Sequence, residues 1–151
     1  MGDNELAHVV RKLSQQYAYT SIQMHEAVAR KAGFSGTDHK YLGFFLTKGR
    51  MTAGELAGIT GLTTGAVTGL VDRLEKKKLV KRKFDTDDRR KVFIEPDTKK
   101  IMALLEPLYK EYRINFEKLT ASFSDKELQI IEAYLLKSVE IMNKAKNNLE
   151  Q

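Results

Sequence analysis

Hydrophobic residues recur every three or four positions through most of the chain, which is the period of an amphipathic helix. In the first segment this period predicts one long helix over about residues 4–31. The positions that carry it are Leu6, Val9, Leu13, Tyr17, Met24 and Val28. The glycine-containing run 31–36 ends this helix, and a short second helix, capped by Thr37 or Asp38, is predicted to extend to Lys48.

Two short helices are predicted on either side of Gly61. The first begins with the capping-box pair Thr52 and Glu55, whose side chains each satisfy a free backbone N–H. Gly61 ends it because the connecting turn needs a positive φ. Ala57 is small where the two helices must nearly touch, and Val67 fills the space between them. These spacings predict a helix-turn-helix, the unit that lays its second helix in the major groove of DNA.

The second of these helices, here called the recognition helix, begins at Thr63 or Thr64 and ends at Lys77 or Lys78. Its buried stripe consists of Val67, Leu70, Val71 and Leu74. With that stripe inward, the outward residues are Gly65, Gly69, Asp72 and Lys76, flanked by Thr68 and Arg73. A glycine in an exposed helix costs about 1 kcal/mol relative to alanine. The two glycines therefore indicate close approach to DNA, although drift explains Gly69 equally well.

Two segments rich in β-branched and aromatic residues, 79–84 and 91–95, follow this helix. The charged run 85–90 between them predicts a turn, so the three segments form a β-hairpin of the kind called a wing. Pro96 is expected to stop the second strand.

The last third of the chain returns to helical spacing. A fifth helix begins near Thr98, and Pro107 is expected to kink it. A second capping box, Ser124 with Glu127, begins a sixth helix. The predicted fold is therefore mostly α-helical with a small β-wing.

Positive charge is concentrated in the segment 48–91. This segment holds twelve Lys or Arg and six acidic residues, an excess that equals the net charge of +6 of the whole chain. A DNA backbone attracts such a segment, whereas charges kept for solubility are more often scattered. The charge pattern therefore favours double-stranded DNA as the partner.

Length and composition narrow the class of protein further. A chain of 151 residues and 17.2 kDa is expected to form one domain. There is no cysteine, which excludes disulfides, thiolate metal sites and thiol redox chemistry. The N-terminal residues are acidic, and no apolar run approaches the ~20 residues of a membrane span. We therefore expect a cytoplasmic protein without a signal peptide.

The polar face of the recognition helix supplies candidate DNA contacts. Thr64 and Thr68 can present a methyl group to thymine or a hydroxyl to a base or phosphate. Arg73 is expected to clamp a phosphate, and the alternative is an ion pair with Asp72 or Glu75.

The tip of the hairpin carries a second set of candidates. Arg89 and Arg90 project from a thin ribbon that fits the narrow minor groove, where negative potential is concentrated. Asp87 and Asp88 are interpreted as turn formers that also orient a guanidinium. The alternative is a charged turn that is merely solvated.

Two stretches resemble the MarR family of bacterial winged-helix regulators. They are Leu-Thr-Thr-Gly-Ala-Val-Thr-Gly-Leu-Val-Asp-Arg-Leu-Glu (62–75) and Asp-Asp-Arg-Arg-Lys-Val-Phe-Ile (87–94). The resemblance covers nearly the full chain and is most specific over residues 52–94. The sequence departs from it at residues 95–97, where the family often ends the wing strand with Leu-Thr.

The resemblance implies a homodimer whose first, fifth and sixth helices intertwine, so that two lobes straddle a near-palindromic operator. On this basis residues 1–151 form a single domain. Residues 37–96 are the winged-helix DNA-binding lobe, and residues 1–36 and 97–151 form the helical dimerisation region.

By the same resemblance, Asp88 and Arg90 match the wing-tip pair of the family, with Arg90 in the minor groove. The candidate DNA-binding residues are Thr52, Thr63, Thr64, Gly65, Thr68, Arg73, Lys76, Asp88, Arg89 and Arg90. No catalytic residue, metal ligand or cofactor is expected.

Dimerisation also follows from the residues themselves. The terminal helices have apolar stripes that are too long for one small lobe to cover, and exposed stripes of this size usually mark an interface. The alternative is that these helices pack against each other within one chain.

The family resemblance further implies a small-molecule effector, often a phenolic or other aromatic anion, bound where the dimer helices join the DNA-binding lobe. Residues that could line such a place are Tyr17, His25, Tyr41, Phe45, Tyr109 and Arg113. Each fits a core or surface position equally well, so the sequence assigns no pocket.

The preferred function is a sequence-specific transcriptional regulator, a repressor released by an effector. The alternative is a non-specific architectural DNA-binding protein that uses the same basic lobe. A winged helix adapted to protein contacts would not need the concentrated charge. An enzyme is the least supported class, because the chain lacks a phosphate-binding glycine loop and a cysteine nucleophile, and His8, His25 and His39 are far apart in sequence.

Overall fold

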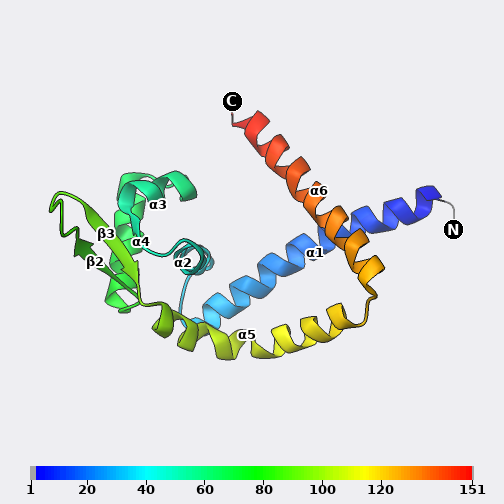
Figure 1. The fold of residues 1–151 in the computed structure, drawn as a ribbon, viewed down its shortest axis with the longest axis horizontal. Coiled ribbons are helices and arrows are strands. Elements are labelled where there is room, and N and C mark those ends of the chain that lie inside the picture. The colour runs from blue at the N-terminus through cyan, green and yellow to red at the C-terminus, as the bar shows by residue number, and fades with distance from the viewer. Residues whose placement is uncertain (1–2, 151) are drawn as a thin grey trace. The chain divides into compact units, whose positions relative to one another are not determined.

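The computed structural model describes residues 3–150, which are mostly helical with one small antiparallel sheet (Figure 1). In chain order the elements are α1 (Asp3–Ala32), α2 (Gly36–Lys48), β1 (Met51–Thr52), α3 (Ala53–Thr60), α4 (Thr64–Lys76), β2 (Val80–Phe84), β3 (Val92–Pro96), α5 (Thr98–Ala121) and α6 (Asp125–Leu149). They form two compact units, the first ending at Tyr109 and the second beginning at Lys110. The predicted fold class is confirmed.

The first unit is organised around one hydrophobic core. Its largest fully buried side chains are Phe45, Leu42, Leu56, Leu70, Leu74, Ile94, Ile101, Val67 and Val71. They come from α2, α3, α4, β3 and the start of α5, and the four from α4 are the stripe that the periodicity predicts. Because this stripe is buried, the opposite face of α4 is held toward solvent.

The predicted helix-turn-helix is confirmed at its turn. Gly61 has φ +70°, and its N–H donates to the carbonyl of Ala57 over 2.9 Å, which ends α3 in a left-handed cap. The predicted capping box begins α3, with Thr52 and Glu55 each accepting from the other's backbone N–H. Thr63 caps α4 by accepting from the backbone N–H of Ala66. Local sequence therefore sets both ends of the turn.

The end of α4 is fixed by a Schellman motif. The N–H of Leu79 donates to the carbonyl of Leu74 over 3.0 Å, and the N–H of Lys78 donates to Glu75 over 2.8 Å. Lys78 has φ +58°, a left-handed conformation that usually falls to glycine. Leu79 is buried immediately after this turn, so the chain enters β2 anchored to the core.

The start of α2 differs from the prediction. Ser35, rather than Thr37 or Asp38, is the cap, and its hydroxyl accepts from the backbone N–H of Asp38 over 3.1 Å. Asp38 is instead a buried residue of the first helical turn. The prediction placed the cap two or three residues too late, although the true cap is local: Ser35 lies three positions before the N–H that it accepts from, the usual N-cap spacing.

The sheet has three strands in the order β1-β3-β2, whereas the sequence predicts only the β2–β3 hairpin. β1 contains two residues, too few to show an alternating pattern, and it pairs with β3 at Ile94 and Phe93. The sequence predicts that this hairpin's second strand ends at residue 95, whereas in the structure Pro96 is the last residue of β3 and lies opposite Val80. The pairing with β1 ends before Pro96, so the missing N–H of proline removes no bond on that side.

The second unit consists of the C-terminal part of α5 and the whole of α6. The predicted Ser124–Glu127 capping box begins α6. No residue of α6 is buried, and the large hydrophobic residues that it exposes are Ile130, Ile131, Tyr134, Leu135, Leu136, Val139, Ile141, Met142 and Leu149. Within residues 3–150 no helix has the length and apolar character needed to cross a membrane.

Candidate nucleic-acid interface

The predicted DNA-binding residues all lie in the first unit, on three segments: the start of α3, the recognition helix α4, and the tip of the β2–β3 hairpin. Those that are exposed to solvent are Thr63, Thr64, Gly65, Thr68, Arg73, Lys76, Arg89 and Arg90. Thr52 and Asp88 are half-buried. None of these positions is in the core, so each residue is accessible at the surface.

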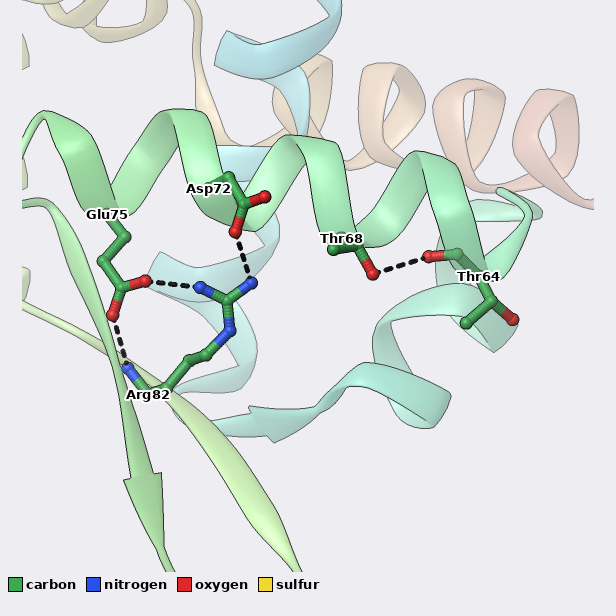
Figure 2. Close-up of polar contacts among 5 residues, drawn as sticks. All are labelled: Thr64, Thr68, Asp72, Glu75 and Arg82. Atoms are coloured by element: carbon green, nitrogen blue, oxygen red, sulfur yellow. Dashed lines mark hydrogen bonds and ion pairs between the residues drawn. The ribbon is translucent and has the colours of Figure 1, made fainter.

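The threonines of this surface already take part in helix structure. The hydroxyl of Thr68 donates to the carbonyl of Thr64 over 3.0 Å (Figure 2). The hydroxyls of Thr52 and Thr63 accept from backbone N–H groups at the caps of α3 and α4. A hydroxyl that accepts a bond retains its hydrogen as a donor, so capping at Thr52 and Thr63 is compatible with a phosphate contact.

Arg73 of α4 makes a contact with α2 that the sequence analysis did not predict. Its Nε donates to Oδ2 of Asp38 over 2.7 Å, and its Nη2 donates to Oδ1 over 2.8 Å. The hydrogen bond with Asp38 raises the pKa of Arg73 above its ordinary value. The alternative ion pair with Asp72 or Glu75 was therefore wrong, because Asp38 of α2 occupies the guanidinium and both other acids face a different arginine.

That arginine is Arg82 of β2, which Figure 2 shows reaching across to α4. Its Nη2 donates to Oδ1 of Asp72 over 2.6 Å, its Nη1 donates to Glu75, and its backbone N–H donates to Glu75 over 3.1 Å. These bonds, the one to Asp72 foremost, raise the pKa of Arg82. Arg82 thus bonds both acids, offsets one of their two negative charges, and ties the wing to the recognition helix. The signal available in the sequence was the outward position of Asp72, an acid on a helix face otherwise suited to DNA.

At the hairpin tip the predicted turn-forming and orienting role is confirmed for Asp88, and Asp85 also forms the turn. Oδ1 of Asp85 accepts from the backbone N–H of Asp87 over 3.1 Å, and Oδ1 of Asp88 accepts from the backbone N–H of Arg90 over 3.0 Å. Asp88 also accepts from Nε of Arg90 over 3.1 Å, and these bonds lower the pKa of Asp88. The side chain of Arg90 is nevertheless 92% exposed. Its guanidinium is oriented by Asp88 while remaining open to a ligand.

The first unit also contains a cavity of about 760 Å³ between α1, α2 and α5. Its walls include Ile22, His25, Glu26, His39, Lys40, Leu105 and Tyr109. Of the residues considered for an effector, His25 and Tyr109 line this cavity. Tyr41 and Phe45 are in the core, Tyr17 is exposed on α1, and Arg113 belongs to the second unit.

Three of the wall residues form one hydrogen-bonded cluster, here called the cavity cluster. The Tyr109 hydroxyl lies 2.6 Å from Nδ1 of His25 and 3.2 Å from Nε2 of His39. The two histidines are far apart in sequence but close in the fold, with ring centroids 6.1 Å apart. Within residues 3–150 no group of three or more His, Cys, Asp or Glu side chains could hold a metal ion.

The cavity cluster predicts a pH dependence of stability. The pKa of His39 lies below its ordinary value of 6.5, mainly because burial disfavours the charged ring and secondarily because charge on His25 opposes it. Below about pH 6.5 the unfolded chain therefore binds a proton at this position more readily than the folded protein does. The free energy of unfolding consequently decreases as the pH is lowered. Thermal unfolding at pH 7.5 and 5.5 measures this loss.

The control for that measurement is His39→Gln, which keeps a polar side chain but does not titrate. We expect its melting temperature to fall less between the two pH values than that of the unmodified protein, with His8→Gln behaving like the unmodified protein. Glu26 and Lys40 also line the cavity. An equal fall in all three proteins would assign the effect to groups other than His39.

Known proteins resemble this chain in both sequence and fold. A MarR family model matches residues 32–91. YcgE of Bacillus subtilis, named as an uncharacterized HTH-type transcriptional regulator, is 36% identical over 151 residues, which cover 98% of this chain and 96% of that protein.

The fold likeness extends over nearly the whole chain. A MarR family protein from Bacillus stearothermophilus has a TM-score of 0.70 at 26% identity, covering 95% of this chain and 99% of that one. A MepR mutant of S. aureus bound to an oligodeoxyribonucleotide has a TM-score of 0.58 at 22% identity, covering 91% and 97%. Fold, helix-turn-helix and full-length sequence similarity agree, and the chain belongs to the MarR family of DNA-binding transcriptional regulators.

Proposed function

We propose that the protein is a homodimeric, sequence-specific repressor that binds a near-palindromic operator and is released by a small-molecule effector. The observation that carries this proposal is the exposed surface of α4 and the wing, which lies within the segment that holds the excess positive charge of the chain. In this role α4 reads the major groove and Arg90 enters the minor groove. The candidate DNA-binding residues keep the roles given by the sequence.

The exposed apolar residues of the terminal helices support a homodimer. α6 has no buried residue in the single chain, and α1 exposes Leu6, Leu13 and Tyr17. Apolar surface of this extent is typical of an interface. We propose that residues 1–36 and 97–151 form the dimerisation region and that residues 37–96 form the DNA-binding lobe of one domain, in a protein that acts in the cytoplasm.

The cavity of the first unit supports control by an effector. Its volume of about 760 Å³ falls in the range of small-molecule sites, about 300–1,000 Å³. It combines apolar walls with a few polar groups, which is the usual composition of such a site. We propose that the effector binds in this cavity and lowers operator affinity.

The proposal is tested by selecting bound sequences from random duplexes and footprinting the selected DNA. We expect two protected half-sites about one helical turn apart, because each protomer presents one recognition helix. We also expect a preference of roughly 10³ or more over random DNA. Equal affinity for all duplexes would indicate an architectural protein instead, and a single short footprint would contradict the dimer geometry.

A further inference from the structure

The ion pair between α2 and α4 joins a buried carboxylate to an exposed guanidinium. The side chain of Asp38 is 8% exposed and that of Arg73 is 57% exposed. Two parallel hydrogen bonds, of 2.7 and 2.8 Å, connect them. A bidentate pair of this kind, here called the fork, fixes the plane of the guanidinium as well as its position. Asp38 is thus screened from solvent while Arg73 is presented on the surface of the recognition helix.

The geometry around Arg73 leaves its third nitrogen outside the fork. Nε and Nη2 both donate to Asp38, whereas Nη1 lies next to Gly69. A Cβ atom added at Gly69 would be 3.3 Å from Nη1, closer than most such contacts. The glycine therefore leaves room for the guanidinium in this conformation. This explains why a glycine is favourable at position 69, which the sequence alone did not explain.

The same helical turn that holds Arg73 also forms part of the cavity wall. His39 follows Asp38 directly and is bonded to Tyr109 in the cavity cluster. Gly36, Thr37 and Lys40 of this turn line the cavity as well. One turn of α2 therefore lines the cavity through His39 and its neighbours, and contacts the recognition helix through Asp38.

We propose that the first turn of α2 couples the cavity to the recognition helix. Asp38 is the positioning residue, which holds Arg73 so that Nη1 donates to a DNA phosphate. The bond between His39 and Tyr109 holds the turn, and a ligand that breaks this bond shifts Asp38 and with it Arg73. This inference rests on the proposed function, because it needs α4 to bind DNA.

The sign of one substitution separates positioning from simple electrostatics. Asp38→Asn removes a negative charge from the DNA-binding lobe, and charge alone would strengthen binding to a polyanion. Positioning predicts the opposite result, because an amide cannot accept both bonds of the fork and Arg73 becomes mobile. The matched control is Asp72→Asn, which also removes a carboxylate that is hydrogen-bonded to an arginine, but an exposed one.

The experiment measures the affinity for a selected duplex over a range of salt concentrations. We expect Asp38→Asn and Arg73→Ala each to weaken binding by about tenfold. Both should lower the slope of log affinity against log salt by about 0.9, the value of one phosphate contact. Asp72→Asn should bind as well as the unmodified protein or better, because its amide oxygen can still accept the single bond from Arg82 and Glu75 still holds the wing. An Asp38→Asn variant with unchanged affinity and slope overturns the proposal.

Arg73→Lys keeps the result decisive if Asp38→Asn fails to fold, because it retains the charge at a surface position and lacks the fork. We expect it to lose most of the affinity that Arg73→Ala loses. Full affinity with lysine would show that charge suffices without positioning, and would overturn the proposal.

Coupling to the cavity is tested with Tyr109→Phe, which removes the hydroxyl between the two histidines. We expect this change to weaken DNA binding in the unmodified background and to have little effect in the Asp38→Asn background, because both act through the same contact. Equal effects in the two backgrounds overturn the coupling. An unmodified protein that binds no duplex overturns the proposed function, whereas normal binding that is insensitive to Asp38 overturns this inference alone.

Discussion

Replacing Arg90 with alanine is expected to weaken binding to the selected operator by about 1–3 kcal/mol, roughly the cost of one lost groove contact. The side chain is 92% exposed at the tip of the hairpin, so its removal takes no packing from the core. Folding should therefore be unchanged while DNA binding is weakened. An equilibrium binding measurement at physiological salt, with a melting curve for each variant, tests both expectations.

The wing geometry explains why the loss should be large for one exposed residue. Asp88 accepts from both the backbone N–H and Nε of Arg90, which restricts the conformations of the guanidinium before DNA arrives. A restricted side chain loses less conformational entropy on binding. The minor groove offers concentrated negative potential where it is narrow, so the proposed position of Arg90 would place its charge where it gains most.

Two other substitutions serve as controls for Arg90→Ala. Arg11→Ala removes an exposed arginine of α1, outside the proposed lobe, and should leave affinity nearly unchanged. Asp88→Ala should weaken binding less than Arg90→Ala, because the arginine remains but loses its support. Unchanged affinity in Arg90→Ala at physiological salt would remove the wing tip from the mechanism.

The sequence predicts well those features that depend on neighbouring residues. The α4 stripe, the left-handed Gly61 and the capping boxes at Thr52 and Ser124 all involve residues within a few positions of each other. Caps and helical periodicity act over one or two turns, so a short window of sequence contains their cause. These are the parts of the fold that were predicted correctly.

The features that the sequence did not predict depend on residues far apart in the chain. Arg73 and Asp38 are separated by 35 positions, and Tyr109 and His25 by 84. Nothing in the local pattern says which helix will supply the partner of a charged side chain. The elements of the DNA-binding surface were therefore predictable, whereas the contacts that hold its side chains and the residues of the cavity required the tertiary structure.

Arg82 lies between these two cases. It is ten positions from Asp72 and seven from Glu75, across the turn that ends α4. From the sequence, the acids on α4 were considered only as partners of Arg73, but their partner in the structure depends on the left-handed Lys78 that brings β2 back along the helix. A single unusual backbone conformation thus decides which cation pairs with the acids of the recognition helix.

Removing residues 124–151 is expected to abolish the homodimer and with it high-affinity DNA binding. The deletion takes away α6, in which no residue is buried within the single chain although hydrophobic residues occur along its length. Light scattering should give twice 17.2 kDa for the full chain and a monomer mass for the deletion variant. Loss of the second lobe should lower operator affinity by about 10²–10⁴-fold, the usual gain from two linked binding sites.

A point substitution separates loss of the interface from loss of folding. Leu135→Glu places a charge on the apolar surface of α6, whereas Lys137→Glu changes charge two residues away without removing an apolar side chain. We expect Leu135→Glu to be monomeric and Lys137→Glu to remain dimeric. A full-length chain that is monomeric at micromolar concentration would contradict the dimer, because an exposed surface of this size would then have no second copy to cover it. If both substituted proteins are dimeric, the interface must lie on another face.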